Sequence, residues 1–120
     1  MAIEVEINIL EEKHLSNPEA LELLKKVAEK IREKEGTIPP LLAKTLEYLQ
    51  KTSKISPEKA RELREKLEEK GLKQESIVMI VNICPNTLGE LRTLLELEEK
   101  SFGEEELKEI LETVKNYCTE

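Results

Sequence analysis

Along most of the chain, hydrophobic residues recur every three or four positions, which is the spacing of an α-helix. The longest apolar run covers residues 77–81 and is followed by Ile83 and Cys84, so a helix here is apolar on nearly every face. A helix of that kind is normally buried. Pro85 ends it, because proline lacks the N–H that an interior helical position needs. Residues 88–97 then predict an amphipathic helix, capped by Asn86 or Thr87, that packs back on the first.

Apolar stripes with residues three or four apart predict four further helices. The first begins at residues 16–19, either with Ser16 in a capping box with Glu19 or with Asn17 as the cap before Pro18. It ends at Gly36, which allows a left-handed C-cap. The second lies between Thr37 and Ser53. The third runs from residue 56 to residue 71 with a narrow apolar stripe, so we expect it to be the most exposed helix. The last covers residues 104–117.

Residues 3–9 have a different pattern, a strict alternation that predicts a β-strand. Its apolar face consists of Ile3, Val5, Ile7 and Ile9, and no second stretch of the chain alternates in this way. A lone strand must pair its N–H and C=O groups elsewhere. The chain therefore either dimerises through this strand or adds it to the sheet of a partner. The remaining alternative is an arm that is frayed or merely packed.

Charge is high and uneven. The 120 residues are 38% charged and carry a formal net charge of −7, which argues against a general nucleic-acid binder. Residues 44–73 nevertheless hold nine Lys and Arg against six Glu, whereas residues 74–120 hold four against eleven. Mixed charges at helical spacing usually form a solvated face. An RNA contact in the basic segment is the minority interpretation, and it would use Lys51, Lys54, Lys59, Arg61, Arg64 and Lys73.

Little in the sequence indicates a catalytic or metal-binding site. All 26 acidic residues are Glu, which disfavours the Asp-dependent magnesium sites of phosphoryl transfer. Cys84 and Cys118 form no CxxC and His14 is the one histidine, so we expect no zinc, other metal or cofactor. Cys84 is interpreted as a small buried hydrophobe, and a disulfide, although conceivable, is not expected without a secretory context. We expect a soluble, cytoplasmic protein without catalytic residues of its own, because no leader or membrane-spanning run is present.

The segment ICPNTLGELR, at residues 83–92, resembles the archaeal RNA polymerase stalk protein designated F, the counterpart of the smaller stalk protein of eukaryotic RNA polymerase II. The family pattern is an apolar helix, a proline break and then Leu-x-Glu-Leu-Arg. The segments LEYL at residues 46–49, SPEKA at residues 56–60 and the ending at residues 106–117 are also similar to the family. Gly89 departs from the acidic residue common at its place, so no role is carried over to it.

The resemblance implies a mainly α fold: an HRDC-like helical bundle at residues 37–120, preceded at residues 1–36 by a β-strand arm and a helix that pair with another polymerase protein. That partner is the larger stalk protein of RNA polymerase, designated E. The heterodimer forms a stalk on the polymerase core that supports promoter opening, nascent RNA contact and processivity, with RNA bound mainly by the partner. The candidate interface residues are Ile3, Val5, Ile7, Ile9, Leu21, Leu24 and Leu46.

Two alternatives stay open at this point. HRDC-like relatives attached to helicases bind nucleic acid, so the chain could be an independent helical nucleic-acid-binding module. It could also be a homo-oligomeric helical protein that uses the strand for self-pairing. The first alternative requires the six basic side chains of residues 51–73 to gather on one face.

Overall fold

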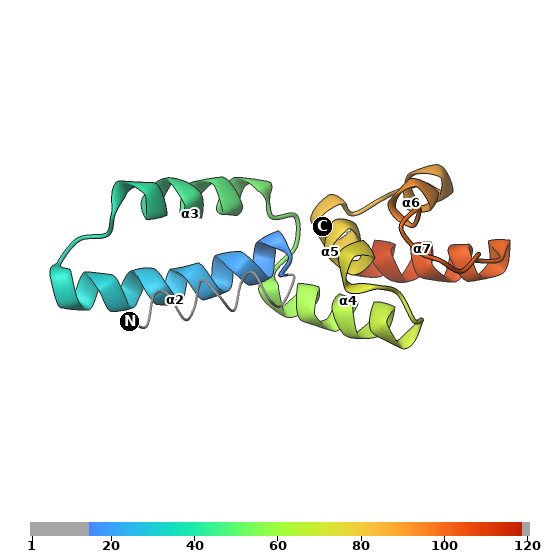
Figure 1. Ribbon diagram of the computed structural model, residues 1–120, viewed down its shortest axis with the longest axis horizontal. Helices are drawn as coiled ribbons and strands as arrows, with labels where there is room; N and C mark the ends of the chain where they lie inside the picture. The colour runs from blue at the N-terminus through green and yellow to red at the C-terminus, as the bar shows by residue number, and fades with distance from the viewer. Residues whose placement is uncertain (1–14, 119–120) are drawn as a thin grey trace.

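The computed structural model describes residues 15–118, and within them it contains six helices and no strand (Figure 1). The mainly helical prediction is therefore confirmed for this part of the chain. The predicted strand, with Ile3, Val5, Ile7 and Ile9, lies outside the described residues. The helices are α2 (Asn17–Glu35), α3 (Pro40–Thr52), α4 (Pro57–Glu69), α5 (Gln74–Ile83), α6 (Leu88–Leu94) and α7 (Glu104–Cys118).

The molecule is elongated, with principal extents of 54 × 28 × 20 Å. Helices α2 and α3 form an antiparallel hairpin at one end, while α4 to α7 gather at the other (Figure 1). The hairpin forms because Gly36, with φ of 84°, adopts the left-handed C-cap that a glycine allows. Pro39 and Pro40 then begin α3, where a missing backbone N–H costs little.

The larger hydrophobic core lies between α4, α5, α6 and α7. Its centre includes Leu63, Leu67, Ile77 and Ile80, all with no exposed surface. Helix α4 was expected to be the most exposed helix, and that expectation is wrong. Its stripe is narrow but is covered from several sides, because α4 packs against α5, α7 and α2.

A smaller core lies within the α2–α3 hairpin. Leu21, Leu24 and Leu49 are buried together there, with Ala20, Leu42 and Leu46 packed against them. Helix α2 also buries Val27, Ala28 and Ile31. Leu49 is the one buried residue of the thirteen in α3. Helix α3 therefore packs mainly on α2, whereas the sequence grouped it with the helices that follow. The division at residue 36 stays a prediction.

Helix α5 is buried on one side only. Ser76, Ile77, Ile80 and Val81 are buried, but Ile83 keeps 42% of its surface exposed. The expectation of a helix buried all round is wrong, because its neighbours do not cover its C-terminal end. The break after α5 and the Thr87 cap of α6 are confirmed, since the Thr87 hydroxyl accepts a hydrogen bond from the Glu90 N–H at 3.1 Å.

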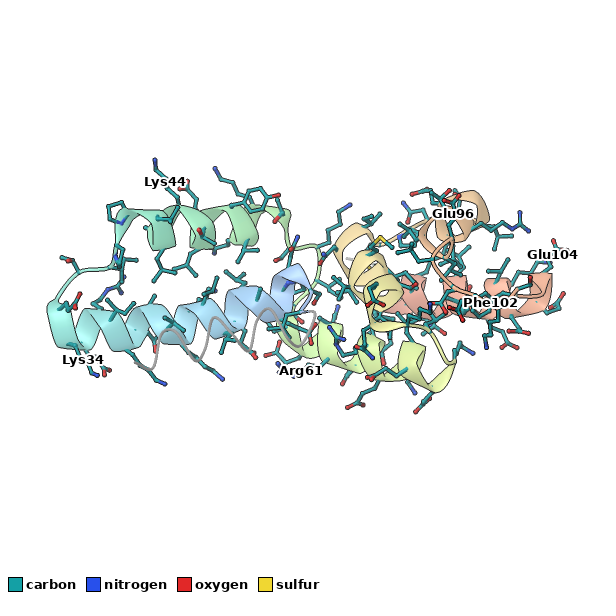
Figure 2. All side chains as sticks on the ribbon, viewed as in Figure 1. Lys34, Lys44, Arg61, Glu96, Phe102 and Glu104 are labelled. Atoms are coloured by element: carbon teal, nitrogen blue, oxygen red, sulfur yellow. A yellow bond between two sulfur atoms is a disulfide. The ribbon has the colours of Figure 1, made fainter. Side chains whose placement is uncertain are left out.

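Cys84 and Cys118 form a disulfide, which the sequence did not predict (Figure 2). Helix α7 runs along the core so that its last residue lies beside the end of α5, and the two Cα atoms are 6.0 Å apart. That separation is in the usual range for a disulfide. Cys84 is thus half-buried and cross-linked, and the interpretation as a free buried hydrophobe is wrong.

Candidate functional site

The three apolar residues predicted at a partner interface within the described chain lie in the hairpin core. Leu21 and Leu24 keep 7% and 8% of their surface exposed, and Leu46 is half-buried against them. Leu21 and Leu24 lie on α2 and face α3, and Leu46 lies on α3 and faces α2. In this structure the three residues therefore hold the hairpin together. A partner could reach them only at the margin of the hairpin or by separating its helices.

The exposed apolar surface of the hairpin lies on another side of α3. Leu41 is 77% exposed and Tyr48 is 63% exposed, and they are seven positions apart, two turns along one side of the helix. Thr45 and Thr52 lie on the same side. We call this stripe the α3 outer face, formed by Leu41, Thr45, Tyr48 and Thr52.

The two threonines make the α3 outer face more apolar than its sequence suggests. The Thr45 hydroxyl donates to the Leu41 carbonyl at 2.9 Å, and the Thr52 hydroxyl donates to the Tyr48 carbonyl at 2.9 Å. Each hydroxyl therefore donates its hydrogen bond within its own helix and does not need an acceptor on a partner. The sequence pattern did not single out Leu41 as a surface residue, because Leu41 and Leu42 can both lie on an apolar stripe with Leu49.

The six basic candidates for RNA contact are spread over α3, the following link, α4 and the start of α5. Lys59 and Arg61 are two positions apart on α4 and so point to nearly opposite sides. Several of the six are engaged within the chain. The contacts are Lys51 to Glu47 at 3.4 Å, Lys54 to the Ile83 carbonyl at 3.0 Å, Arg61 to Glu22 at 2.6 Å, Arg64 to Glu19 at 2.6 Å and Lys73 to Glu99 at 3.6 Å.

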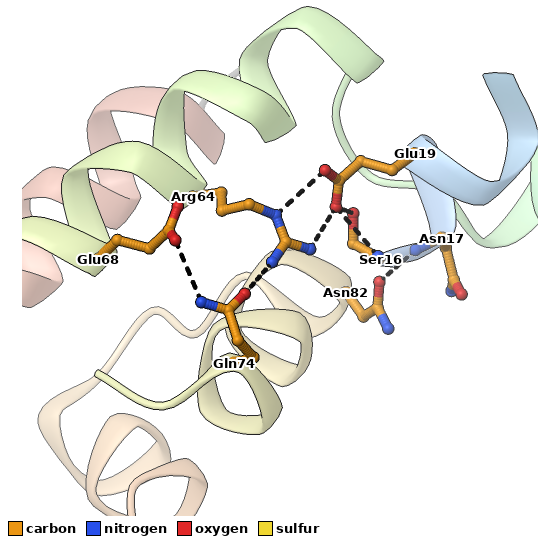
Figure 3. A network of polar contacts seen from close by, with 7 residues as sticks. All are labelled: Ser16, Asn17, Glu19, Arg64, Glu68, Gln74 and Asn82. Atoms are coloured by element: carbon orange, nitrogen blue, oxygen red, sulfur yellow. Dashed lines mark hydrogen bonds and ion pairs between the residues drawn. The ribbon is translucent and has the colours of Figure 1, made fainter. Parts of the chain in front are cut away.

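Arg64 belongs to a polar network at the junction of the two cores (Figure 3). The guanidinium donates to Glu19 through Nε at 3.1 Å and through Nη2 at 2.6 Å, and it also donates to the Gln74 side-chain oxygen. Gln74 in turn donates to Glu68 at 3.1 Å. We call this set the junction network; it consists of Ser16, Asn17, Glu19, Arg64, Glu68, Gln74 and Asn82.

The junction network attaches the start of α2 to α4 and α5. The Ser16 N–H and hydroxyl donate to Glu19 at 3.1 and 2.7 Å, and the Asn17 N–H donates to the Asn82 side-chain oxygen at 2.7 Å. The N–H of the cap residue thus finds its acceptor on Glu19, and the first N–H of α2 finds its acceptor on α5. Sequence reasoning identified Ser16 and Glu19 as a cap and missed their role between helices.

Glu19 is charged within this junction. Burial raises the pKa of its carboxyl group, but hydrogen bonds from Arg64 and Ser16 outweigh that effect, so the pKa lies below its ordinary value. The Glu19 and Arg64 side chains are only 10% and 13% exposed. The pair is therefore a positioning contact for the hairpin, with little access for a ligand.

Residues 15–118 contain no group of three or more His, Cys, Asp or Glu side chains that could hold a metal ion. None of the helices in the described part is long and apolar enough to cross a membrane.

Comparison with known proteins gives consistent matches. A family model described as RNA polymerase Rpb4 matches residues 14–118. The chain is 28% identical over 83 residues to the DNA-directed RNA polymerase subunit Rpo4 of Sulfolobus acidocaldarius, covering 68% of this chain and 73% of that protein. It is 26% identical over 112 residues to the Rpo4 protein of Saccharolobus solfataricus, covering 92% and 95%. It is 38% identical over 72 residues to the Rpo4 protein of Methanocaldococcus jannaschii, covering 60% of each chain.

Proposed function

The chain belongs to the RNA polymerase Rpb4 family, and from this premise we propose that it is a non-catalytic subunit of DNA-directed RNA polymerase. We further propose that it forms a heterodimer with the larger stalk protein, designated E. In this proposal the heterodimer is a stalk on the polymerase core that supports promoter opening, nascent RNA contact and processivity. The protein would act in the cytoplasm, with an HRDC-like bundle at residues 37–120 preceded by a partner-binding part at residues 1–36.

The observation that carries the proposal is the extent of the family match. It spans residues 14–118, and the three relatives described above are all subunits of DNA-directed RNA polymerase. The surface of the hairpin adds support, because α3 exposes two large apolar side chains along one side. A surface of that kind suits assembly with another protein.

We propose that the partner covers the α3 outer face in addition to pairing with the strand predicted at residues 3–9. Leu41 and Tyr48 are large, exposed and adjacent on one helix, and side chains of this kind mark contact sites when they cluster. Leu49 is the one buried residue of α3, so a partner that covers α3 would also reinforce its attachment to α2. Leu21, Leu24 and Leu46 would then support the interface from within.

A paired substitution on α3 tests this surface. Leu41→Glu with Tyr48→Glu places two charges on the α3 outer face, and burying them against a partner should weaken the complex with the larger stalk protein at least about 100-fold. The matched control is Ala43→Glu with Gln50→Glu. These residues are also exposed and seven apart, but they lie on the other flank of α3.

The measurement is co-expression with the larger stalk protein from the same genome, followed by titration of the purified chains. Wild type and control should give a 1:1 complex, and the Leu41/Tyr48 variant should lose it while keeping its helical circular dichroism. Equal affinity of the two variants would refute the α3 surface. A wild-type chain that forms no complex with the larger stalk protein would refute the heterodimer itself. Deleting residues 1–10 should also weaken the complex, and unchanged affinity would refute the strand.

The alternative of an independent nucleic-acid module has less support. It needs the six basic residues to act together, and five of them have acceptors within the chain, four of these being Glu carboxylates. A salt titration of RNA binding by the isolated chain separates the two functions, because phosphate contacts produce a steep salt dependence. Strong binding at low salt with a steep slope would favour the alternative.

A further inference from the structure

The disulfide between Cys84 and Cys118 joins the C-terminal end of α5 to the last residue of α7, 34 positions along the chain (Figure 2). It therefore closes a covalent loop around α6 and most of α7. Both cysteines are half-buried, so the disulfide lies at the margin of the core. The bond is placed between two segments that would otherwise be free to move apart.

The first of these segments is the turn at Cys84. Cys84 has φ of 53° and ψ of 68°, and among the described residues it is the one non-glycine with positive φ. The Cβ atom makes that conformation unfavourable for an L-residue, and Pro85 further restricts the residue before it. The turn is held by a hydrogen bond from the Cys84 N–H to the Ile80 carbonyl at 2.8 Å and by the disulfide.

The second segment is the last turn of α7. Val114 is fully buried, but beyond it Lys115 and Asn116 are exposed and Tyr117 and Cys118 are only half-buried. The final carbonyl groups of a helix have no intrahelical partner, and terminal turns open readily. The disulfide is the covalent contact that fixes this turn to the rest of the core.

From these observations we propose that the Cys84–Cys118 disulfide is a reducible clasp that opens the C-terminal end of the molecule without unfolding it. A thiolate of a dithiol reductant attacks one sulfur and forms a mixed disulfide, and the second thiol of the reductant displaces the protein sulfur. The reductant loses two electrons and two protons and becomes a disulfide. The protein gains them as the thiols of Cys84 and Cys118.

The rest of the core keeps its packing when the clasp opens. Leu63, Leu67, Ile77 and Ile80 are fully buried at its centre, whereas Tyr117 and Cys118 are only partly buried against it. Opening instead affects residues 115–118 and the turn at residues 84–87. Because the Lys54 side chain donates to the Ile83 carbonyl at 3.0 Å, the change also reaches the link between α3 and α4.

Hydrogen exchange of the full chain, oxidised or treated with dithiothreitol, tests the proposal. Reduction should speed exchange of the amides at residues 115–118 and of the Cys84 amide by about tenfold or more, with α4 unchanged. It should also lower the Tm by on the order of 10 °C. The Cys84→Ser, Cys118→Ser variant should behave as the reduced chain and should not respond to dithiothreitol.

A second variant separates the turn from the cross-link. Cys84→Gly with Cys118→Ser lacks the bond but carries a residue that accepts positive φ. It should keep the amide of residue 84 protected while the end of α7 exchanges fast. The clasp would be overturned by unchanged exchange at residues 115–118 after reduction. It would equally be overturned if α4 lost protection together with α7, or if both thiols stayed free under oxidised glutathione.

Discussion

Replacing Glu19 by Gln should destabilise the protein more than its position at a helix start suggests. The Glu19 carboxylate accepts hydrogen bonds from the Arg64 Nε and Nη2 atoms and from the Ser16 N–H and hydroxyl. A carboxamide keeps one acceptor and turns the other oxygen into a donor that faces donors. It also leaves the Arg64 guanidinium, 13% exposed, without its carboxylate.

The size of the effect follows from this burial. Breaking a fully buried ion pair by removing one partner costs about 3–5 kcal/mol. Because Arg64 keeps Gln74 as an acceptor and the pair is not completely sealed, we expect a loss of about 2–3 kcal/mol in the free energy of unfolding. Urea denaturation followed by circular dichroism measures it. Glu29→Gln is the control, an exposed residue of the same helix with the same change of charge, and its effect should stay below about 0.5 kcal/mol.

The destabilisation should also depend on pH in a defined direction. The folded pKa of Glu19 lies below its ordinary value of 4.5, so the unfolded chain binds the proton more tightly. The stability that the carboxylate contributes is complete above that ordinary value and is lost as pH falls through the folded pKa. The difference between wild type and Glu19→Gln should therefore shrink below pH 4.5.

Two results would refute this reasoning. One is a loss for Glu19→Gln no larger than that of the Glu29 control. The other is strict additivity in a double-mutant cycle with Arg64→Gln, because residues in one hydrogen-bond network normally show coupling of about 0.5–3 kcal/mol. A destabilisation that stayed the same from neutral pH to about pH 3 would show that the charge of Glu19 does not contribute.

Two further predictions concern the cores and the hairpin turn. Leu63→Ala removes a fully buried side chain from the centre of the larger core and should cost about 3 kcal/mol, measured as the shift in urea midpoint at an unchanged m-value. A loss below about 1 kcal/mol would mean that this core is loosely packed. Gly36→Ala should cost about 1 kcal/mol for a conformational reason alone. Its φ is +84° and an added Cβ would meet no atom within 4 Å, so Gly36→Asn, which tolerates that region better, should cost less.

Local signals in the sequence were sufficient to locate the helices. Ser16 and Gly36 bound α2 as predicted, Pro57 begins α4, and Pro85 separates α5 from α6. These positions depend on backbone rules that act over a few residues. The same rules show which face of a helix is apolar but not which helix will cover it. In the structure α3 packs on α2, a contact that these local rules do not specify.

The contacts that tie the molecule together could not be predicted for the same reason. Glu19 and Arg64 are 45 residues apart and Cys84 and Cys118 are 34 apart, so neither pair has a spacing that local structure makes meaningful. Each sequence position was explained well enough by a local role. Glu19 belonged to a cap, Arg64 to a charged helix face and Cys84 to an apolar run. Each of these residues also makes a contact between helices, and that contact does not alter the local pattern of hydrophobic and polar residues.

The type of contact at the junction has a consequence for the hairpin. Hydrophobic contacts tolerate sliding, whereas the junction network consists of directional hydrogen bonds that fix α2 against α4 and α5 in one orientation. Because the network fixes the start of α2, the hairpin depends on this attachment for its position relative to α4 and α5. None of the residues of the α3 outer face belongs to the junction network, so a partner bound there would leave the network intact. Glu19→Gln should therefore weaken partner binding as well as stability, whereas Leu41→Glu with Tyr48→Glu should weaken binding alone.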